Sequence, residues 1–95
     1  MSSITRGRVS EYKAINALLL NGWEVCEPCV TKAYDLLAKP ANEDKWYKVQ
    51  VKTAFERTDR NNDIVVFAKR NGGRTYTKED TDLFVGVLGD KCYLF

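Results

Sequence analysis

Apolar residues near the start of the chain recur at helical spacing. Five of them fall on one side of a helix: Val9, Tyr12, Ile15, Leu18 and Leu19. Ser10 and Glu11 come early in this stretch, and Asn21-Gly22 supplies a stop signal. The pattern predicts a helix from about residue 6 to residue 21.

After this helix the pattern changes to short β-prone runs. Residues 23–30 are predicted as a strand that ends or bends at Pro28, and residues 33–38 as a second short strand. A polar turn over residues 39–44 leads to a third strand over residues 45–54, in which polar and apolar positions alternate.

The C-terminal half continues with loops and strands. Residues 58–63 have the composition of a loop, residues 64–67 suit a buried strand, and Asn71-Gly72-Gly73 marks a tight reversal. Thr77 and Asp80 resemble a capping box, so a short helical turn is predicted to start at Lys78. A closing hairpin is predicted from residues 83–88 and 91–95 across a Gly-Asp turn. Together these elements predict an α/β fold.

Length and charge narrow the class of protein. Ninety-five residues suffice for one domain, 1–95, with one modest core. The net charge of +2, from 15 Lys and Arg against 13 Asp and Glu, is compatible with nucleic acid without requiring it. The N-terminus lacks a signal-like apolar run, and Leu18-Leu19-Leu20 is too short to span a membrane. We expect a soluble, cytoplasmic protein without a membrane partner.

Three cysteines make an odd count in a chain with no secretion signal, which argues against a disulfide framework. Cys26-Glu27-Pro28-Cys29 has the spacing of a redox pair or of half a zinc site. A closed zinc site needs four ligands, and the chain has no histidine and only Cys92 besides. Reduced cysteines are the favoured interpretation, and a redox or zinc protein remains a third functional hypothesis.

Four polar residues from three predicted elements can converge on one place. Glu11 lies on the core-facing stripe of the predicted helix, and Asp35 sits among apolar neighbours in the second predicted strand. Gln50 and Lys52 share a face of the third strand, because alternate strand residues point the same way. A charged group on an apolar face needs a partner, so these residues are candidates for a common site.

The chemistry of such a cluster favours a magnesium site. Mg²⁺ takes hard oxygen ligands, typically one or two carboxylates with waters and substrate phosphate oxygens. Asp35 and the Gln50 carbonyl meet this demand, Lys52 could orient water or stabilise developing charge, and Glu11 would complete the outer shell. In the plain alternative, Glu11 pairs with Lys52, Asp35 caps a turn, and no metal is involved.

These residues resemble the motif of the PD-(D/E)XK nuclease superfamily over nearly the whole chain. The family's helix glutamate matches Glu11 in Gly7-Arg8-Val9-Ser10-Glu11, its metal aspartate matches Asp35, and its (D/E)XK triplet matches Gln50-Val51-Lys52. The layout is similar to archaeal-type Holliday junction resolvases and to small phage or intron endonucleases.

Other positions bear on the same resemblance. Tyr76-Thr77-x-x-Asp80-x-Asp82-x-Phe84 resembles a segment that recurs after the core in one branch of small bacterial and phage endonucleases. Two positions depart from the usual motif: Tyr34 stands where many members have proline, and Gln50 replaces an acid. Some homing endonucleases with this fold resemble the chain in having glutamine there.

The resemblance implies a restriction-endonuclease-like core with a mixed β-sheet flanked by helices. It implies a Mg²⁺-dependent DNA endonuclease, with Mn²⁺ as a substitute. The metal would be held by Asp35, Gln50 and Val51, and the catalytic set would be Glu11, Asp35, Gln50 and Lys52. The DNA would be duplex or branched, cutting would be structure-selective or nicking, and a homodimer would supply two sites. A phage or mobile-element origin is expected on the same ground.

Basic side chains flanking the site are the expected DNA contacts. The principal ones are Arg6, Arg8, Lys48, Lys69, Arg70 and Arg74, with Lys45, Arg57 and Arg60 as further candidates. Each is ordinary solvated surface in the alternative interpretation. Because Gln50 removes one negative charge from the metal shell, a second hypothesis is a nuclease-like fold that binds DNA without cutting it, as a DNA-binding or inhibitor module.

Overall fold

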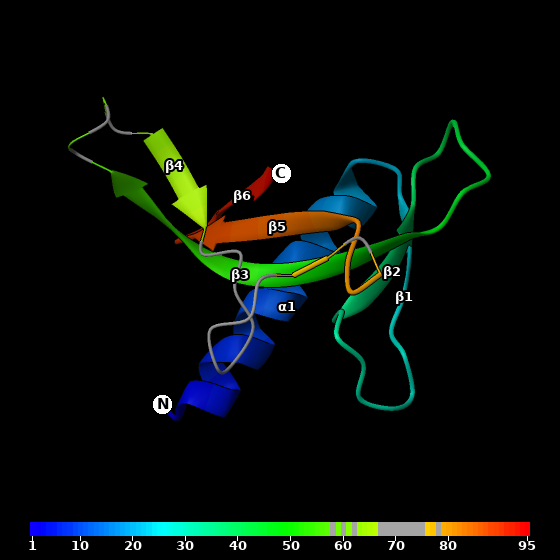
Figure 1. Cartoon of the computed structure of the whole chain (residues 1–95), viewed down its shortest axis with the longest axis horizontal. Helices are drawn as coiled ribbons and strands as arrows, with labels where there is room; N and C mark the ends of the chain where they lie inside the picture. The colour runs from blue at the N-terminus through cyan, green and yellow to red at the C-terminus, as the bar shows by residue number, and fades with distance from the viewer. Residues whose placement is uncertain (58, 60, 62, 67–75, 78) are drawn as a thin grey trace.

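The structure is a computed structural model that describes residues 1–57, 59, 61, 63–66, 76–77 and 79–95. Within these residues it contains one helix and six strands. Figure 1 shows the helix crossing one face of a curved sheet. In the same part of the chain, no helix is long and apolar enough to cross a membrane.

Helix α1 runs over Ser3–Leu20, so it begins earlier than the predicted start near residue 6. The N-cap explains the difference, because the Ser2 hydroxyl accepts a hydrogen bond from the Thr5 backbone N–H at 3.1 Å. The predicted stop is confirmed: Asn21 forms the C-cap, and Gly22 follows with a φ of 84°, a conformation that favours glycine.

The helix packs on the sheet through a small buried face. Ala14 is 0% exposed and Leu18 is 7% exposed, and both belong to the main core. The sheet contributes the other buried members of that core: Leu36, Ala38, Val49, Val51, Val85 and Val87. Val49 and Val51 thus point toward α1, in agreement with the predicted alternation along this strand. This packing places Glu11 of α1 near the middle of the sheet.

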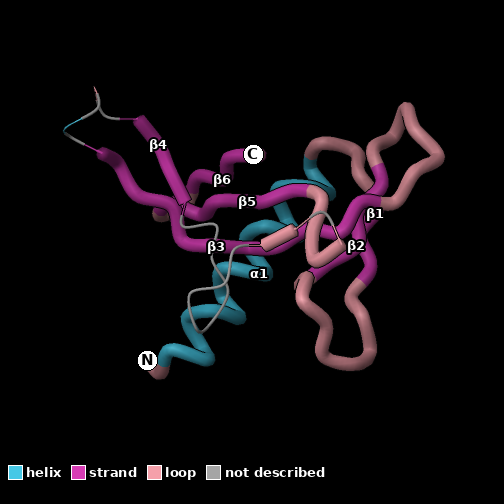
Figure 2. Tube along the Cα trace, in the orientation of Figure 1, coloured by secondary structure: helices cyan, strands magenta, loops and turns pink. Residues whose placement is uncertain are grey.

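The sheet is mixed, as predicted. Its path is β1–β2–β3–β5–β6, and β4 pairs with β3 outside that path. The strands are β1 (Glu24–Cys26), β2 (Leu36–Lys39), β3 (Tyr47–Arg57), β4 (Asp63–Val66), β5 (Leu83–Leu88) and β6 (Lys91–Leu94). Among the described pairings, β3–β5 is parallel and the others are antiparallel. Figure 2 shows β3 running from beside β2 to beside β4. The α/β class is confirmed, although within the described residues one helix, rather than several, flanks the sheet.

The first two strands are shorter than predicted. β1 ends at Cys26, two residues before Pro28, where the sequence predicted that the strand ends or bends. β2 begins at Leu36, so Asp35 lies directly before the strand and not on its face. Cys26 pairs with Leu37, which puts residues 27 and 35 at the same end of this antiparallel pair.

Strand β3 extends beyond its predicted end. It continues to Arg57 because β4 pairs with its last residues, from Ala54 with Val66 to Arg57 with Asp63. β4 is partly exposed, so the prediction of a buried strand over residues 64–67 was wrong in that respect. Residue 67 and the predicted reversal at residues 71–73 lie outside the described residues.

The C-terminal elements follow the prediction closely. Asp80 Oδ2 accepts the Thr77 N–H at 3.0 Å, and the Thr81 N–H donates to the Thr77 carbonyl at 3.0 Å, so these hydrogen bonds close a turn where one was predicted. The predicted first residue of that turn, Lys78, lies outside the described residues. β5 and β6 form the predicted hairpin, with Gly89 at a φ of 59° in the turn.

The face of the sheet away from α1 has a close contact at Gly86. A Cβ there would lie 2.8 Å from Phe95 Cε2, 2.8 Å from Val66 Cγ1 and 3.0 Å from Ala54 Cβ. Side chains from β4 and the C-terminus therefore pack directly against the backbone of β5, and glycine leaves the room for them.

Candidate functional site

Asp35, directly before β2 begins, continues the hydrogen bonding along the edge of β3. Its backbone N–H donates to the Val49 carbonyl at 2.9 Å, and its Oδ2 accepts the Val51 N–H at 2.9 Å. If β2 continued in this direction, the Val51 N–H would donate to a backbone carbonyl of that strand. The Asp35 carboxylate accepts this hydrogen bond instead. Asp35 thus caps the edge of a strand, whereas the plain alternative expected it to cap a turn.

Gln50 contacts the same carboxylate through its amide nitrogen. Nε2 donates to Asp35 Oδ2 at 2.9 Å, while Oε1 is buried without a hydrogen-bond partner. The residue is 9% exposed, and leaving a buried carbonyl unpaired costs about 1–3 kcal/mol. A half-turn of the terminal amide would exchange the two atoms and present Oε1 on the side of Asp35.

Val51 offers a further oxygen at this place. The N–H and C=O of one strand residue point to the same edge in an antiparallel pairing. Because the Val51 N–H reaches Asp35, the Val51 carbonyl lies on the edge that carries the carboxylate. The Asp35 carboxylate and the Val51 carbonyl therefore offer oxygen atoms at this edge, and the Gln50 amide would add a third after the half-turn described above.

These groups line an open pocket of about 660 Å³ between the N-terminal half of α1 and the middle of β3. The structure brings the residues predicted for catalysis and metal binding together in its lining: Glu11, Asp35, Gln50, Val51 and Lys52. They come from α1, from the residue directly before β2 and from β3. The buried core described above holds α1 against β3.

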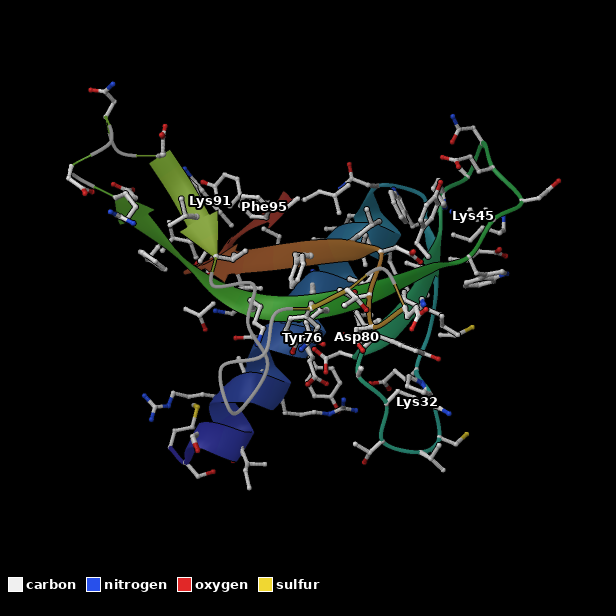
Figure 3. The ribbon with its side chains drawn as sticks, viewed as in Figure 1. Lys32, Lys45, Tyr76, Asp80, Lys91 and Phe95 are labelled. Atoms are coloured by element: carbon white, nitrogen blue, oxygen red, sulfur yellow. The ribbon has the colours of Figure 1, made fainter. Side chains whose placement is uncertain are left out.

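Lys52 also contacts an aromatic side chain. Its Nζ lies 5.0 Å from the centre of the Tyr76 ring, within the range of a cation–π interaction. The Tyr76 ring meets Phe84 edge to face, with ring centres 5.4 Å apart. Tyr76 is labelled beside β3 in Figure 3. The segment that resembled other endonucleases therefore lies against the lysine of the motif.

Glu11 pairs with Arg8 of the same helix. Arg8 Nη1 donates to Glu11 Oε1 at 2.7 Å and to Glu27 Oε1 at 2.7 Å. The Glu11 side chain is 23% exposed, so the predicted position on the inner stripe of the helix is partly buried. Glu11 thus forms its ion pair with Arg8, whereas the plain alternative paired it with Lys52. The two carboxylates raise the pKa of the Arg8 guanidinium further above its usual range.

The electrostatics of the pocket centre on Asp35. Burial raises the pKa of its carboxyl group, the Val51 N–H bond lowers that pKa, and the nearby charge of Glu11 raises it. Lys52 and Arg8 lower it, in that order. A carboxylate that is desolvated beside a second acid favours the arrival of a cation.

Some of the residues expected to contact DNA lie in the part of the chain that the structure describes, and the others lie outside it. Arg6 is exposed and lines the large pocket, and Arg8 is paired as above. Lys48 Nζ donates to the Glu79 carbonyl at 2.7 Å. Lys69, Arg70 and Arg74 lie outside the described residues, as does Arg60. Of the further candidates, Lys45 lies over the Tyr47 ring and Arg57 is bonded to Asp59.

One residue of the site was not anticipated. Glu27 contacts Arg8, yet the sequence interpretation of its segment considered only the flanking cysteines. An acid directly after a predicted strand was the available signal. Cys26 and Cys29 are exposed free thiols. Within the described residues, no three His, Cys, Asp or Glu side chains gather into a group able to hold a metal ion.

Comparison with protein families decides the class. A family model described as PD-(D/E)XK endonuclease matches residues 1–95. The chain belongs to this family. Among solved structures, this PD-(D/E)XK endonuclease chain is similar to a bacterial homing endonuclease, I-Ssp6803I, with a TM-score of 0.73 and 25% sequence identity. The match covers 100% of this chain and 69% of that chain. A comparison with curated proteins gives no match.

The donor set of this PD-(D/E)XK chain fits a hard divalent cation. It offers one carboxylate at the centre, an amide oxygen and a backbone carbonyl, with a second carboxylate in the same pocket. Mg²⁺ is commonly bound through one or two carboxylates and completes its shell with water and phosphate oxygens. The unpaired Gln50 Oε1 is the atom of this set that most clearly lacks a partner.

Proposed function

We propose that this protein is a Mg²⁺-dependent endonuclease that hydrolyses phosphodiester bonds in DNA, with Mn²⁺ as a substitute. The observation that carries the proposal is the Gln50 side chain, whose amide reaches the Asp35 carboxylate through Nε2 while its buried Oε1 has no hydrogen-bond partner. Membership of the PD-(D/E)XK endonuclease family supports nuclease chemistry, and the homing endonuclease neighbour supports DNA as the substrate.

In this proposal Asp35, Gln50 and Val51 hold the cation through their oxygen atoms. A bound divalent cation supplies Lewis acidity, which polarises the scissile phosphate and eases deprotonation of the attacking water. The Val51 N–H bond to Oδ2 orients the Asp35 carboxylate in advance, and a half-turn of the Gln50 amide would turn its oxygen to the cation. Gln50 adds no charge of its own, so Asp35 and Glu11 supply the negative charge that attracts the cation.

Lys52 would act on the phosphate and the water. Its ammonium group can donate to a phosphate oxygen or to the attacking water, and its charge offsets the negative charge that develops during hydrolysis. The Tyr76 ring restrains the ammonium group from one side. Glu11 would bind water in the outer shell from its position on α1.

We propose structure-selective cutting of branched DNA, or nicking, over recognition of a long sequence by one copy of this chain. Arg6, an exposed basic side chain in the pocket lining, would contact the DNA backbone. Two strands would be cut by a homodimer with two such pockets. A phage or mobile-element origin is consistent with the homing endonuclease neighbour.

Supercoiled plasmid and a four-way DNA junction, each incubated with Mg²⁺, with Mn²⁺ or with EDTA, test the proposal. We expect product with either metal and none with EDTA. Asp35→Asn and Lys52→Ala should each lower the cleavage rate by about 100-fold or more while DNA binding in EDTA persists, because they remove stabilisation of the transition state. Asp44→Ala and Lys91→Ala, at exposed positions, are the matched controls. An unchanged rate in Asp35→Asn or Lys52→Ala would move the centre elsewhere.

A second candidate is a nuclease-like fold that binds DNA without cutting it. The observation that favours it is the Gln50 amide, whose Nε2 already satisfies Asp35 without a metal. This candidate predicts DNA binding without product under every metal condition above. Gln50→Glu, which restores the acid of the family motif, would then create cleavage that the wild type lacks.

A further inference from the structure

Arg8 is bound by two carboxylates from different parts of the chain. Its Nη1 donates to both Glu11 Oε1 and Glu27 Oε1 at 2.7 Å, and its Cζ lies 4.7 Å from the centre of the Tyr12 ring. Charge-assisted bonds of this length are among the stronger hydrogen bonds in proteins. The guanidinium group is therefore held by bonds to Glu11 and Glu27 and by the face of Tyr12.

Glu27 and Asp35 stand at the two ends of one loop. Glu27 directly follows β1, Asp35 directly precedes β2, and Lys32 between them is labelled in Figure 3. The backbone and side chain of Asp35 tie its end of the loop to β3. Arg8 ties the other end, through Glu27, to α1. One side chain thus joins the helix to the loop that carries the central aspartate.

A second pocket lies under this loop. It has a volume of about 330 Å³, and its lining includes Arg8, Glu11, Glu27 and Asp35. Glu11 and Asp35 also line the larger pocket, so the two acids stand where the pockets meet. The bond from Arg8 to Glu11 sets the position of one of these two acids.

The charges around Arg8 disfavour a phosphate contact. Two carboxylates already neutralise the guanidinium group, and both would repel a phosphate brought to it. Removing Arg8 from these partners would leave Glu11 without its hydrogen-bond donor. Arg6, in contrast, is exposed beside the large pocket.

We infer that Arg8 is a positioning residue, which holds Glu11 beside Asp35 and anchors the loop over residues 27–35 to α1. This inference rests on the proposed function, because it gives Arg8 a task at the proposed metal centre. The sequence analysis listed Arg8 among the expected DNA contacts, and under this inference Arg8 does not bind phosphate.

A charge-matched substitution tests the inference. Loss of Arg8 alone would mix two opposite effects, since removing a positive charge favours cation binding and removing the anchor disfavours it. The double variant Arg8→Met/Glu27→Gln removes one charge of each sign and leaves the net charge unchanged. A comparable exchange away from the site, Lys39→Met/Glu24→Gln, breaks an ion pair of 3.5 Å between β2 and β1 and serves as the control.

Mn²⁺ binding without DNA is the first measurement. Isothermal titration calorimetry gives the Kd at a temperature where circular dichroism shows each variant to be folded. We expect the Kd of Arg8→Met/Glu27→Gln to rise by about tenfold or more, as for other residues that orient metal ligands. The control should keep the wild-type Kd. Arg8→Lys, which can donate to both acids, should restore most of the affinity.

The salt dependence of DNA binding in EDTA is the second measurement. A residue that neutralises one phosphate contributes about 0.9 to the slope of log K against log salt. We expect the slope of Arg8→Met/Glu27→Gln to equal that of the wild type and the slope of Arg6→Met to be shallower by about 0.9. A shallower slope in the double variant would assign Arg8 to phosphate and overturn the inference.

An unchanged Mn²⁺ Kd in the double variant would also overturn it, whatever the slope. The proposed function fails by a different result, namely a wild type without Asp35-dependent Mn²⁺ binding and without metal-dependent cleavage. That result overturns both statements, whereas the two results above overturn the role of Arg8 alone.

Discussion

Replacing Gln50 with glutamate puts a carboxylate where a hydrogen-bond donor now stands. In the structure Gln50 Nε2 donates to Asp35 Oδ2 at 2.9 Å, and Gln50 is 9% exposed. Gln50→Glu removes the donor and, at neutral pH, sets two negative charges side by side away from water. The metal-free fold should lose stability, whereas a cation in the pocket should bind more tightly.

The size of the loss follows from the bond that disappears. A hydrogen bond to a charged group contributes about 1.5–3 kcal/mol, and we take about 2 kcal/mol here. For a domain of this length, 1 kcal/mol corresponds to a change in Tm of about 4–8 °C. The Tm of Gln50→Glu in EDTA should therefore fall by about 8–16 °C. Adjacent carboxylates retain a proton more readily than isolated ones, so the loss should shrink as the pH is lowered.

Thermal melts followed by circular dichroism, in EDTA and in excess Mn²⁺, measure both effects. A tenfold tighter Kd adds about 1.4 kcal/mol to the stabilisation by Mn²⁺, so the gap between the two conditions should be wider in Gln50→Glu than in the wild type. The double variant Gln50→Glu/Asp35→Asn exchanges the amide and the acid and restores both the hydrogen bond and the net charge. Its Tm in EDTA should return toward the wild-type value.

Two results would refute this reasoning. One is a Tm in EDTA for Gln50→Glu that equals or exceeds that of the wild type. The other is a double variant that is no more stable than Gln50→Glu, since the exchanged pair would then make no contact of the kind described.

Two further predictions concern stability without metal. Burial raises the pKa of Asp35, so the folded protein binds this proton more readily than the unfolded chain does. Relative to Asp35→Asn, the wild type in EDTA should therefore lose stability as the pH rises through the raised pKa. Free energies of unfolding, measured by urea denaturation at each pH, would contradict this if they changed with pH by the same amount in both proteins. Gly86→Ala should cost about 1–3 kcal/mol in urea denaturation, because its Cβ would lie 2.8 Å from Phe95 and Val66. Gly7→Ala, whose Cβ meets nothing within 4 Å in α1, should instead add about 0.5–1 kcal/mol, and equal effects at the two glycines would contradict the packing described.

Elements with local signals were predicted well from the sequence. Asn21-Gly22 ends the helix, and Gly89-Asp90 turns the last hairpin, because a few neighbouring residues determine each conformation. Strand ends were predicted poorly, because they depend on a partner that is distant in the sequence. β3 reaches Arg57 because β4 pairs there, and β2 starts at Leu36 because Asp35 turns its side chain, and not a backbone carbonyl, to β3.

The members of the candidate site were predictable in the same limited sense. The helical stripe placed Glu11 and strand alternation placed Gln50 and Lys52, whereas Asp35 lines the same pocket from directly before β2 and not from the predicted strand face. Their hydrogen bonds were not predictable, because spacing along a chain carries no information on which side chains pair. Glu11 bonds to Arg8 and not to Lys52, and Arg8 also reaches Glu27 across the fold.

Strand β3 has a pairing partner at every one of its residues. Tyr47 to Val49 pair with β2, Val49 to Thr53 with β5, and Ala54 to Arg57 with β4. Its middle part, Val49 to Thr53, is held by β5 on one edge and by Asp35 at Val49 and Val51 on the other, so the amide protons there should exchange with solvent more slowly than those of the end paired with β4. The wall of the pocket that carries Gln50 and Lys52 is thus the slowly exchanging one. If the pocket changes shape to fit a bent or branched DNA, the opposite wall has to move. That wall lies where the loop after β1 meets the first turns of α1.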